Sequence, residues 1–149
     1  MAVNTEYVGR VFAATEPYEV SRVKIADFAD AIGEPSALCR DKSAAQQAGY
    51  PDVIAPPTFA IVISMVSADE ANRDPGLGLD YSMVVHGTQG FTYTRPLHAG
   101  DVVVATTTVE SIKALGATSV LTTSTDISTT DGEHICTAKS TLVERGADS

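Results

Sequence analysis

The sequence predicts an α+β fold in which a curved antiparallel sheet wraps around one long, buried helix. Helical patterns occupy the first half of the chain, and strand patterns follow from Tyr81 onward. Helices grouped before a run of strands are typical of α+β proteins. Within the first half, residues 59–66 are apolar or small at nearly every position, which indicates a helix buried on most sides. The 149 residues contain no internal repeat or linker, so we expect residues 1–149 to form a single domain.

The first half begins with an extended segment and two short helices. Ser21 is a suitable N-cap for a helix over residues 22–32, and Gly33 is suited to end it. A second helix is expected within residues 41–50, ending at Gly49. The apolar face of the first helix consists of Val23, Ile25, Phe28 and Ile32.

The long helix is expected over about residues 56–72. Pro56 and Pro57 suit the first turn of a helix, where a missing N–H group leaves no hydrogen bond unmade. The apolar run then gives way to the polar stretch ADEANRD at residues 68–74, which brings the end of the helix into solvent.

The second half of the chain reads as a series of antiparallel strands rich in Val, Ile and Thr. Asp131-Gly132 is a strong hairpin signal, and Gly100-Asp101 marks another turn. A helix sheltered by such a sheet of five to six strands is the hot-dog fold. Its exposed edge strands favour a two-fold dimer of the isolated protein. The strand segments are residues 90–97, 101–114, 117–129 and 133–145.

Composition excludes several classes of partner. The formal net charge is -9 and the pI is about 4.6, so phosphate backbones and anionic membrane surfaces would be repelled. No signal peptide or membrane-spanning window is apparent. Cys39 and Cys136 are expected to be free thiols in a reducing cytoplasm. The three histidines lack metal-ligand spacing, and we expect neither a metal nor another cofactor.

Two segments carry a resemblance to a known family. IGEPSALCRDKSAAQQAGYPDVIAPPTF (residues 32–59) and HGTQGFTYTRPLHAGDVV (residues 86–103) resemble the MaoC-like (R)-specific hydratase/dehydratase superfamily. Within it, the chain is similar to actinobacterial proteins related to the type-I fatty-acid-synthase dehydratase domain. The non-catalytic subunit of mycobacterial (3R)-hydroxyacyl-ACP dehydratase is one of these. The resemblance extends over about residues 7–145.

The resemblance implies a hot-dog domain that dimerises edge to edge, with an acyl-thioester tunnel at the interface. Catalytic relatives carry a G-D-x-N-P-x-H loop, whose Asp and His handle the water and the C2 proton in reversible hydration of a trans-2-enoyl thioester. A backbone N–H from the Gly of an HG pair binds the thioester carbonyl. Alignment without gaps puts Gly33, Glu34, Ser36, Ala37 and Cys39 on the loop's Gly, Asp, Asn, Pro and His, and Pro56-Pro57 on the HG pair.

Three of these replacements alter the chemistry. A cysteine such as Cys39 has an ordinary pKa of about 8.5, against about 6.5 for histidine, and cannot relay a proton between two ring nitrogens. Glu34 extends the carboxylate by one carbon, on the order of 1.5 Å. Pro57 has no N–H and cannot donate to an oxyanion. The loop is therefore predicted to occupy the position of a catalytic loop without having its catalytic groups.

Simpler roles compete at each candidate residue. Cys39 is favoured as a packing residue over a nucleophile, and Glu34 as a loop carboxylate paired with Arg40 over a general base. For His86, a binding or interface role and simple surface exposure are weighed equally, and Gln89 has the same standing.

The start of the apolar run, Thr58 and Phe59, is expected to line the acyl tunnel.

Three functions remain open. The first is a non-catalytic subunit that binds an acyl-CoA or acyl-ACP thioester while a MaoC-type partner supplies the catalytic loop. The second is a homodimeric hydratase that uses Glu34, and the third is an acyl-thioester-binding module without chemistry.

Overall fold

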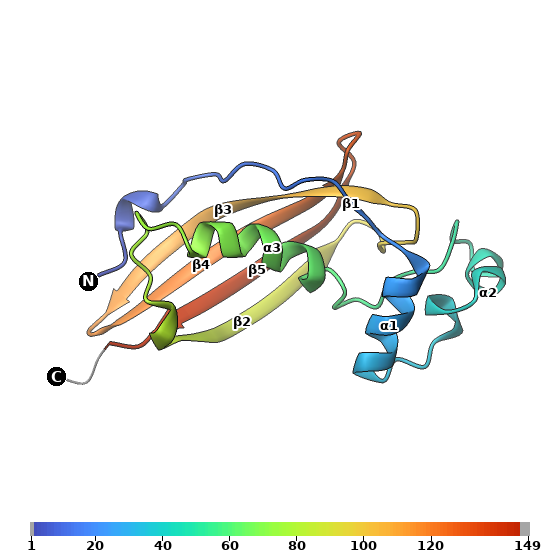
Figure 1. The fold of residues 1–149 in the computed structure, drawn as a ribbon, viewed down its shortest axis with the longest axis horizontal. Coiled ribbons are helices and arrows are strands. Elements are labelled where there is room, and N and C mark those ends of the chain that lie inside the picture. Colours follow the sequence, from blue (N-terminus) through green and yellow to red (C-terminus); the bar gives the residue numbers. More distant parts are fainter. Residues whose placement is uncertain (1, 147–149) are drawn as a thin grey trace.

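In the computed structural model, which describes residues 2–146, a five-stranded antiparallel sheet curls around helix α3 (Figure 1). The strand order is β1-β3-β4-β5-β2. The α-helices are α1 (Arg22–Ile32), α2 (Lys42–Gln47) and α3 (Ile61–Asn72). The short 3-10 helices are η1 (Thr5–Tyr7), η2 (Ala37–Cys39) and η3 (Tyr81–Met83). The strands are β1 (Tyr18–Glu19), β2 (Val84–Tyr93), β3 (Val102–Leu115), β4 (Thr118–Thr129) and β5 (His134–Glu144). This architecture confirms the predicted α+β class.

The first two helices begin and end where local chemistry directs them. The Ser21 side chain accepts a hydrogen bond from the Lys24 N–H, and Gly33 closes α1 with a φ of 71°, a conformation that favours glycine. Asp41 caps α2 in the same way by accepting from backbone N–H groups. Both helices lie beside one another at one end of the sheet (Figure 1).

Helix α3 begins later than predicted. Residues 57–60 form successive turns, in which the Phe59 N–H donates to the Pro56 carbonyl at 2.9 Å and the Ile61 N–H to the Thr58 carbonyl at 3.1 Å. Regular helical bonding starts where the Ser64 N–H donates to the Ala60 carbonyl. The prediction of a start near residue 56 was therefore wrong: tandem prolines supply no N–H groups and keep the residue before each proline out of the helical region.

The buried face of α3 packs against β3 and β4 through apolar contacts and a chain of hydroxyls. Ser67 Oγ lies 2.7 Å from Thr107 Oγ1, which lies 2.7 Å from Thr125 Oγ1. The opposite face of the helix is less covered than its apolar sequence predicted. Met65 is 52% exposed and Val66 is 64% exposed.

Strands β3, β4 and β5 follow the predicted segments 101–114, 117–129 and 133–145 closely. The prediction of a strand over residues 90–97 was wrong in its bounds: β2 starts six residues earlier and ends at Tyr93, because Pro96 supplies no N–H for the sheet. At the β4–β5 hairpin the Thr129 N–H donates to the Glu133 carbonyl, and Gly132 has a φ of 94°, as the Asp131-Gly132 pair predicted. Strand β2 differs from β3, β4 and β5, because every one of its ten residues is at least partly exposed. Its outer edge faces no other strand within residues 2–146.

Candidate functional site

The loop after α1 is held by its own polar side chains. The Glu34 N–H donates to the Ala29 carbonyl at 2.8 Å, and a Glu34 carboxylate oxygen accepts from the Ser36 N–H at 3.0 Å. Ser36 Oγ in turn accepts from the Leu38 N–H at 3.2 Å. These bonds shape the turn that leads into η2 and place Cys39 on its inner side.

This loop forms one wall of a pocket of about 390 Å³. The opposite wall comes from the segment before α3 and from the end of β2. Residues assigned by the resemblance to the catalytic loop and to the carbonyl-binding pair thus line one cavity. The lining residues are Glu34, Ser36, Cys39, Ile54, Ala55, Pro56, Pro57, Tyr93 and Pro96.

The Cys39 thiol is poorly suited to acid–base work. Cys39 is 4% exposed, and burial, followed by the nearby Glu34 carboxylate, raises its pKa, an effect that Arg40 partly offsets. The thiol is therefore protonated at neutral pH. Arg40 does not pair with the Glu34 carboxylate as expected: its guanidinium binds Asp30 Oδ1 at 2.6 Å and the Glu34 carbonyl at 2.7 Å.

Pro57 offers an acceptor where the catalytic relatives are expected to offer a donor. Its carbonyl accepts a 2.6 Å hydrogen bond from the Tyr93 hydroxyl. Burial, followed by the neighbouring Cys136, raises the pKa of Tyr93, and burial raises that of Cys136 to about 11. Sequence reasoning did not single out Tyr93, because its period-2 pattern with Phe91 signals only a strand.

Thr58 and Gln89 meet in a second pocket of about 410 Å³. It lies between the turns before α3 and the middle of β2. Phe59 has a different position: it is fully buried and packs edge-on against Phe28, with ring centroids 5.4 Å apart. Phe59 therefore supports the start of α3 from within the core.

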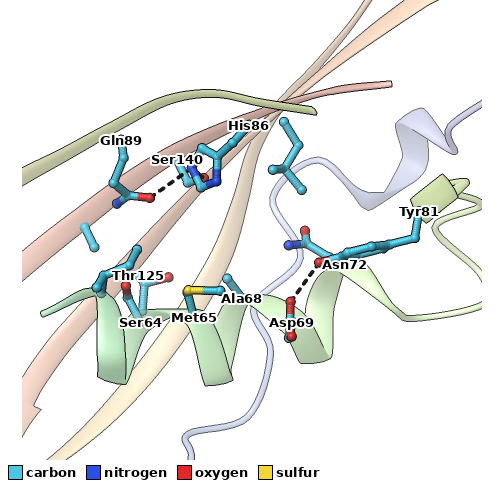
Figure 2. A pocket seen from close by; sticks show the side chains of 13 residues that line it. Ser64, Met65, Ala68, Asp69, Asn72, Tyr81, His86, Gln89, Thr125 and Ser140 are labelled. Carbon is cyan, nitrogen blue, oxygen red and sulfur yellow. Dashed lines mark hydrogen bonds between the residues drawn. The ribbon is translucent and has the colours of Figure 1, made fainter. Parts of the chain in front are cut away.

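His86 takes part in a small polar network beside a third pocket of about 60 Å³ (Figure 2). Its Nε2 lies 3.1 Å from Ser140 Oγ and 3.2 Å from Gln89 Oε1. This pocket lies between α3 and strands β2 and β5, so the structure brings His86 and Gln89 together facing the helix (Figure 2).

The motif RPLHAGD has a structural role next to the first pocket. Arg95 makes a bidentate pair with the buried Asp101 at 2.8 and 2.9 Å, and also binds Glu133. These carboxylates raise the pKa of Arg95. Asp101 further accepts from the His98 N–H, so the motif fixes the connection from β2 to β3.

Within residues 2–146, no cluster of three or more His, Cys, Asp or Glu side chains could hold a metal ion. The same residues contain no helix that combines the length and the apolar character needed to cross a bilayer.

Comparisons with known proteins agree with the fold. The UPF0336 protein of Thermobifida fusca is 55% identical over 146 residues, which cover 98% of this chain and 96% of the relative. The UPF0336 protein of Streptomyces avermitilis is 48% identical over 148 residues, which cover 99% of each.

Among solved structures, the C-terminally truncated HadBC (3R-hydroxyacyl-ACP dehydratase) complex of Mycobacterium tuberculosis aligns with a TM-score of 0.84 and 24% identity. That alignment covers 93% of this chain and 98% of the other. A MaoC-like dehydratase aligns with a TM-score of 0.87 and 26% identity, over 95% of this chain and 43% of the other. These likenesses confirm the hot-dog fold.

The model of the family described as "FAS1-like, dehydratase domain region" matches residues 6–138. This range contains the loop after α1, helix α3 and most of the sheet, and it confirms the resemblance drawn from the sequence. The chain belongs to the FAS1-like dehydratase domain family.

Proposed function

We propose that the protein is the substrate-binding, catalytically degenerate subunit of a heterodimeric (3R)-hydroxyacyl-thioester dehydratase. One observation carries this proposal: the pocket that gathers the positional equivalents of the catalytic groups holds Glu34, Cys39 and Pro57. Cys39 is a protonated thiol, Pro57 has no N–H, and Glu34 is engaged by the Ser36 N–H. In this proposal the pocket still binds a thioester, and the catalytic groups come from the partner.

The heterodimer is supported by the kinds of structure that share the fold. Both the HadBC complex and the ChsH1-ChsH2 complex of Mycobacterium tuberculosis contain such a domain. In our proposal this chain supplies a sheet and part of the acyl groove, and a MaoC-type partner supplies an intact Asp/His loop. The ligand is an acyl-CoA or acyl-ACP thioester. In the absence of the partner, the chain pairs with a second copy of itself.

A homodimeric hydratase is the second candidate, because Glu34 does place a carboxylate in the pocket. The two candidates differ in the activity of the purified protein. Loss of an oxyanion donor typically costs about 10²–10³ in rate, and loss of general acid–base catalysis about 10²–10⁴, although such losses need not multiply.

The test follows the loss of enoyl absorbance with crotonyl-CoA and longer enoyl-CoA substrates, for the protein alone and with proteins that co-purify from its native cell. We expect negligible turnover alone and strong turnover with a partner that carries the intact loop. Robust turnover alone that survives Cys39→Ala and is abolished by Glu34→Gln would establish the homodimeric enzyme instead. Thioester binding without turnover in any combination would identify a binding module.

A further inference from the structure

The three pockets adjoin one another along α3 and β2, and together we call them the groove. The pocket at the loop and the pocket at Thr58 share Pro57 and Tyr93 as lining residues. The pocket at Thr58 and the pocket at His86 share Ile61 and Gln89. The groove therefore leads from the loop, past the start of α3, to Asn72 at the other end of this helix. At 1.5 Å of rise per residue, Ile61 and Asn72 are about 16 Å apart along the axis.

The far end of the groove holds a buried polar atom without a partner. Asn72 is 6% exposed, and its Oδ1 accepts no hydrogen bond from any described residue. A buried acceptor left in this state is destabilising, and such atoms are rare in folded proteins. Figure 2 shows the Asn72 side chain beside Tyr81, on the same side of α3 as Asp69. The Tyr81 hydroxyl is already committed, since it donates to Asp69 Oδ1 at 2.7 Å.

The walls on the way to Asn72 alternate between apolar and polar surfaces. Met65, Ala68 and Leu142 provide an apolar path suited to methylene groups. Ser64 and the His86–Gln89–Ser140 network add polar groups on both sides. A groove made only for a saturated chain would place such groups against hydrocarbon, which is unfavourable.

We propose that this groove accepts an acyl chain that carries a hydroxyl group at its distal end, and that the hydroxyl donates to Asn72 Oδ1. This inference rests on the proposed function, because it assumes that a thioester binds at the loop. The pocket that leads to Asn72 has a volume of only about 60 Å³, so it is suited to a single unbranched chain and not to a ring or a second chain. A terminal carboxylate is disfavoured, because Asp69 lines the same pocket and the protein has a formal net charge of -9.

The test measures binding by calorimetry, with saturated acyl-CoA probes from hexanoyl to tetradecanoyl and their ω-hydroxy and ω-carboxy counterparts. Saturated chains cannot be hydrated, so binding is read without turnover. At the chain length that reaches Asn72, we expect the ω-hydroxy probe to bind about 3–10-fold more tightly than the plain probe. The ω-carboxy probe should bind most weakly.

Asn72→Leu should abolish or reverse the hydroxyl preference, whereas Gln47→Leu, the same kind of replacement on the exposed surface of α2, should retain it. If Asn72→Leu does not fold, Asn72→Ala removes the amide altogether and must lose the preference too. Plain and ω-hydroxy probes that bind equally at every length overturn this inference and leave the proposed function standing, with Asn72 Oδ1 bound to water only. Failure of every acyl-CoA probe to bind overturns the proposed function itself.

Discussion

At the scale of single residues, the Cys39 thiol is the clearest support for the proposed loss of catalysis. It occupies the position expected for a catalytic histidine, but it lies in the core cluster with Phe59 and Ile63. Burial and the Glu34 carboxylate both favour the neutral thiol, so their effects on its pKa add. The residue packs well and exchanges protons poorly.

Cys39 should therefore react slowly with iodoacetamide at neutral pH, at least tenfold more slowly than a free thiol, because only the thiolate attacks. Glu34→Gln should speed the reaction by lowering the pKa of Cys39. Glu19→Gln, at an exposed position in β1, should change nothing. Peptide mass mapping separates Cys39 from Cys136. Rapid alkylation of Cys39 in the unaltered protein would contradict this account.

Restoration of the catalytic loop should require several replacements together. Cys39→His alone should recover little hydration activity, because Pro57 still lacks an N–H and the Glu34 side chain is still one carbon longer than the expected aspartate. The combination Glu34→Asp, Ser36→Asn, Cys39→His and Pro57→Gly should give a measurable rate in the enoyl-absorbance assay. The control replaces Pro57→Gly by Pro57→Ala in this combination. Alanine also introduces a backbone N–H, but without the conformational freedom of glycine. Full activity from Cys39→His alone would refute the degenerate-loop interpretation.

At the scale of elements, the hydroxyl chain beneath α3 joins the helix to the sheet. Thr107→Val removes its middle member and leaves Ser67 and Thr125 without that partner. We expect a loss of about 1–3 kcal/mol in the free energy of unfolding. The triple variant Ser67→Ala, Thr107→Val, Thr125→Val should be more stable than Thr107→Val alone, because no hydroxyl is left unpaired. Urea denaturation measures both, and additive losses would disprove the coupling.

The ion pair between α1 and the segment after α2 should stabilise the fold to a degree that depends on pH. Arg22 at the start of α1 binds Asp52 at 2.7 and 2.9 Å, and this pair, with help from the Val53 N–H, lowers the pKa of Asp52 to about 2. A carboxylate with a depressed folded-state pKa stabilises the fold above its unfolded pKa near 4, and this stabilisation is lost as the pH falls toward 2.

Arg22→Leu should thus lower the free energy of unfolding near pH 6 by the small amount typical of an exposed ion pair, and this loss should shrink as the pH falls from about 4 toward 2. Lys24→Leu, an exposed cation on the same helix, should show no such dependence. Unfolding free energies measured across this range check the prediction, and a cost that persists at pH 2 would rule out the Arg22–Asp52 pair as its cause.

At the scale of the whole molecule, the open edge of β2 and the exposed residues of α3 indicate an assembly. Within residues 2–146, the outer edge of this ten-residue strand presents unpaired backbone groups. The exposed side chain of Met65 adds apolar surface beside His86 and Gln89 of the strand. We expect light scattering to report a dimer of the isolated protein at micromolar concentration.

Charges placed on β2 should dissociate this dimer. Val85→Lys combined with Thr92→Lys should give a folded monomer, because lysines on an edge strand oppose strand pairing. Val23→Lys combined with Thr130→Lys adds the same charge at exposed positions away from β2 and should remain dimeric. A dimer that survives the β2 changes would place the interface elsewhere.

The sequence by itself determined the features that depend on neighbouring residues. The Ser21 cap, the Gly33 stop and the Asp131-Gly132 hairpin are local, because each depends on the chemistry and backbone freedom of a few adjacent positions. The α+β class followed from the same kind of pattern, and residues 32–59 together with residues 86–103 carried the family resemblance.

Only the tertiary structure decided what depends on distance through space. Local spacing suggested Glu34 as the partner of Arg40, whereas the folded chain brings Asp30 closer. No pattern in the sequence links Asn72 to His86, or Tyr93 to Pro57, because their approach requires α3 to lie across a curved sheet. The groove and its polar end arise from that packing, which joins residues that are remote in sequence and that no local preference brings together.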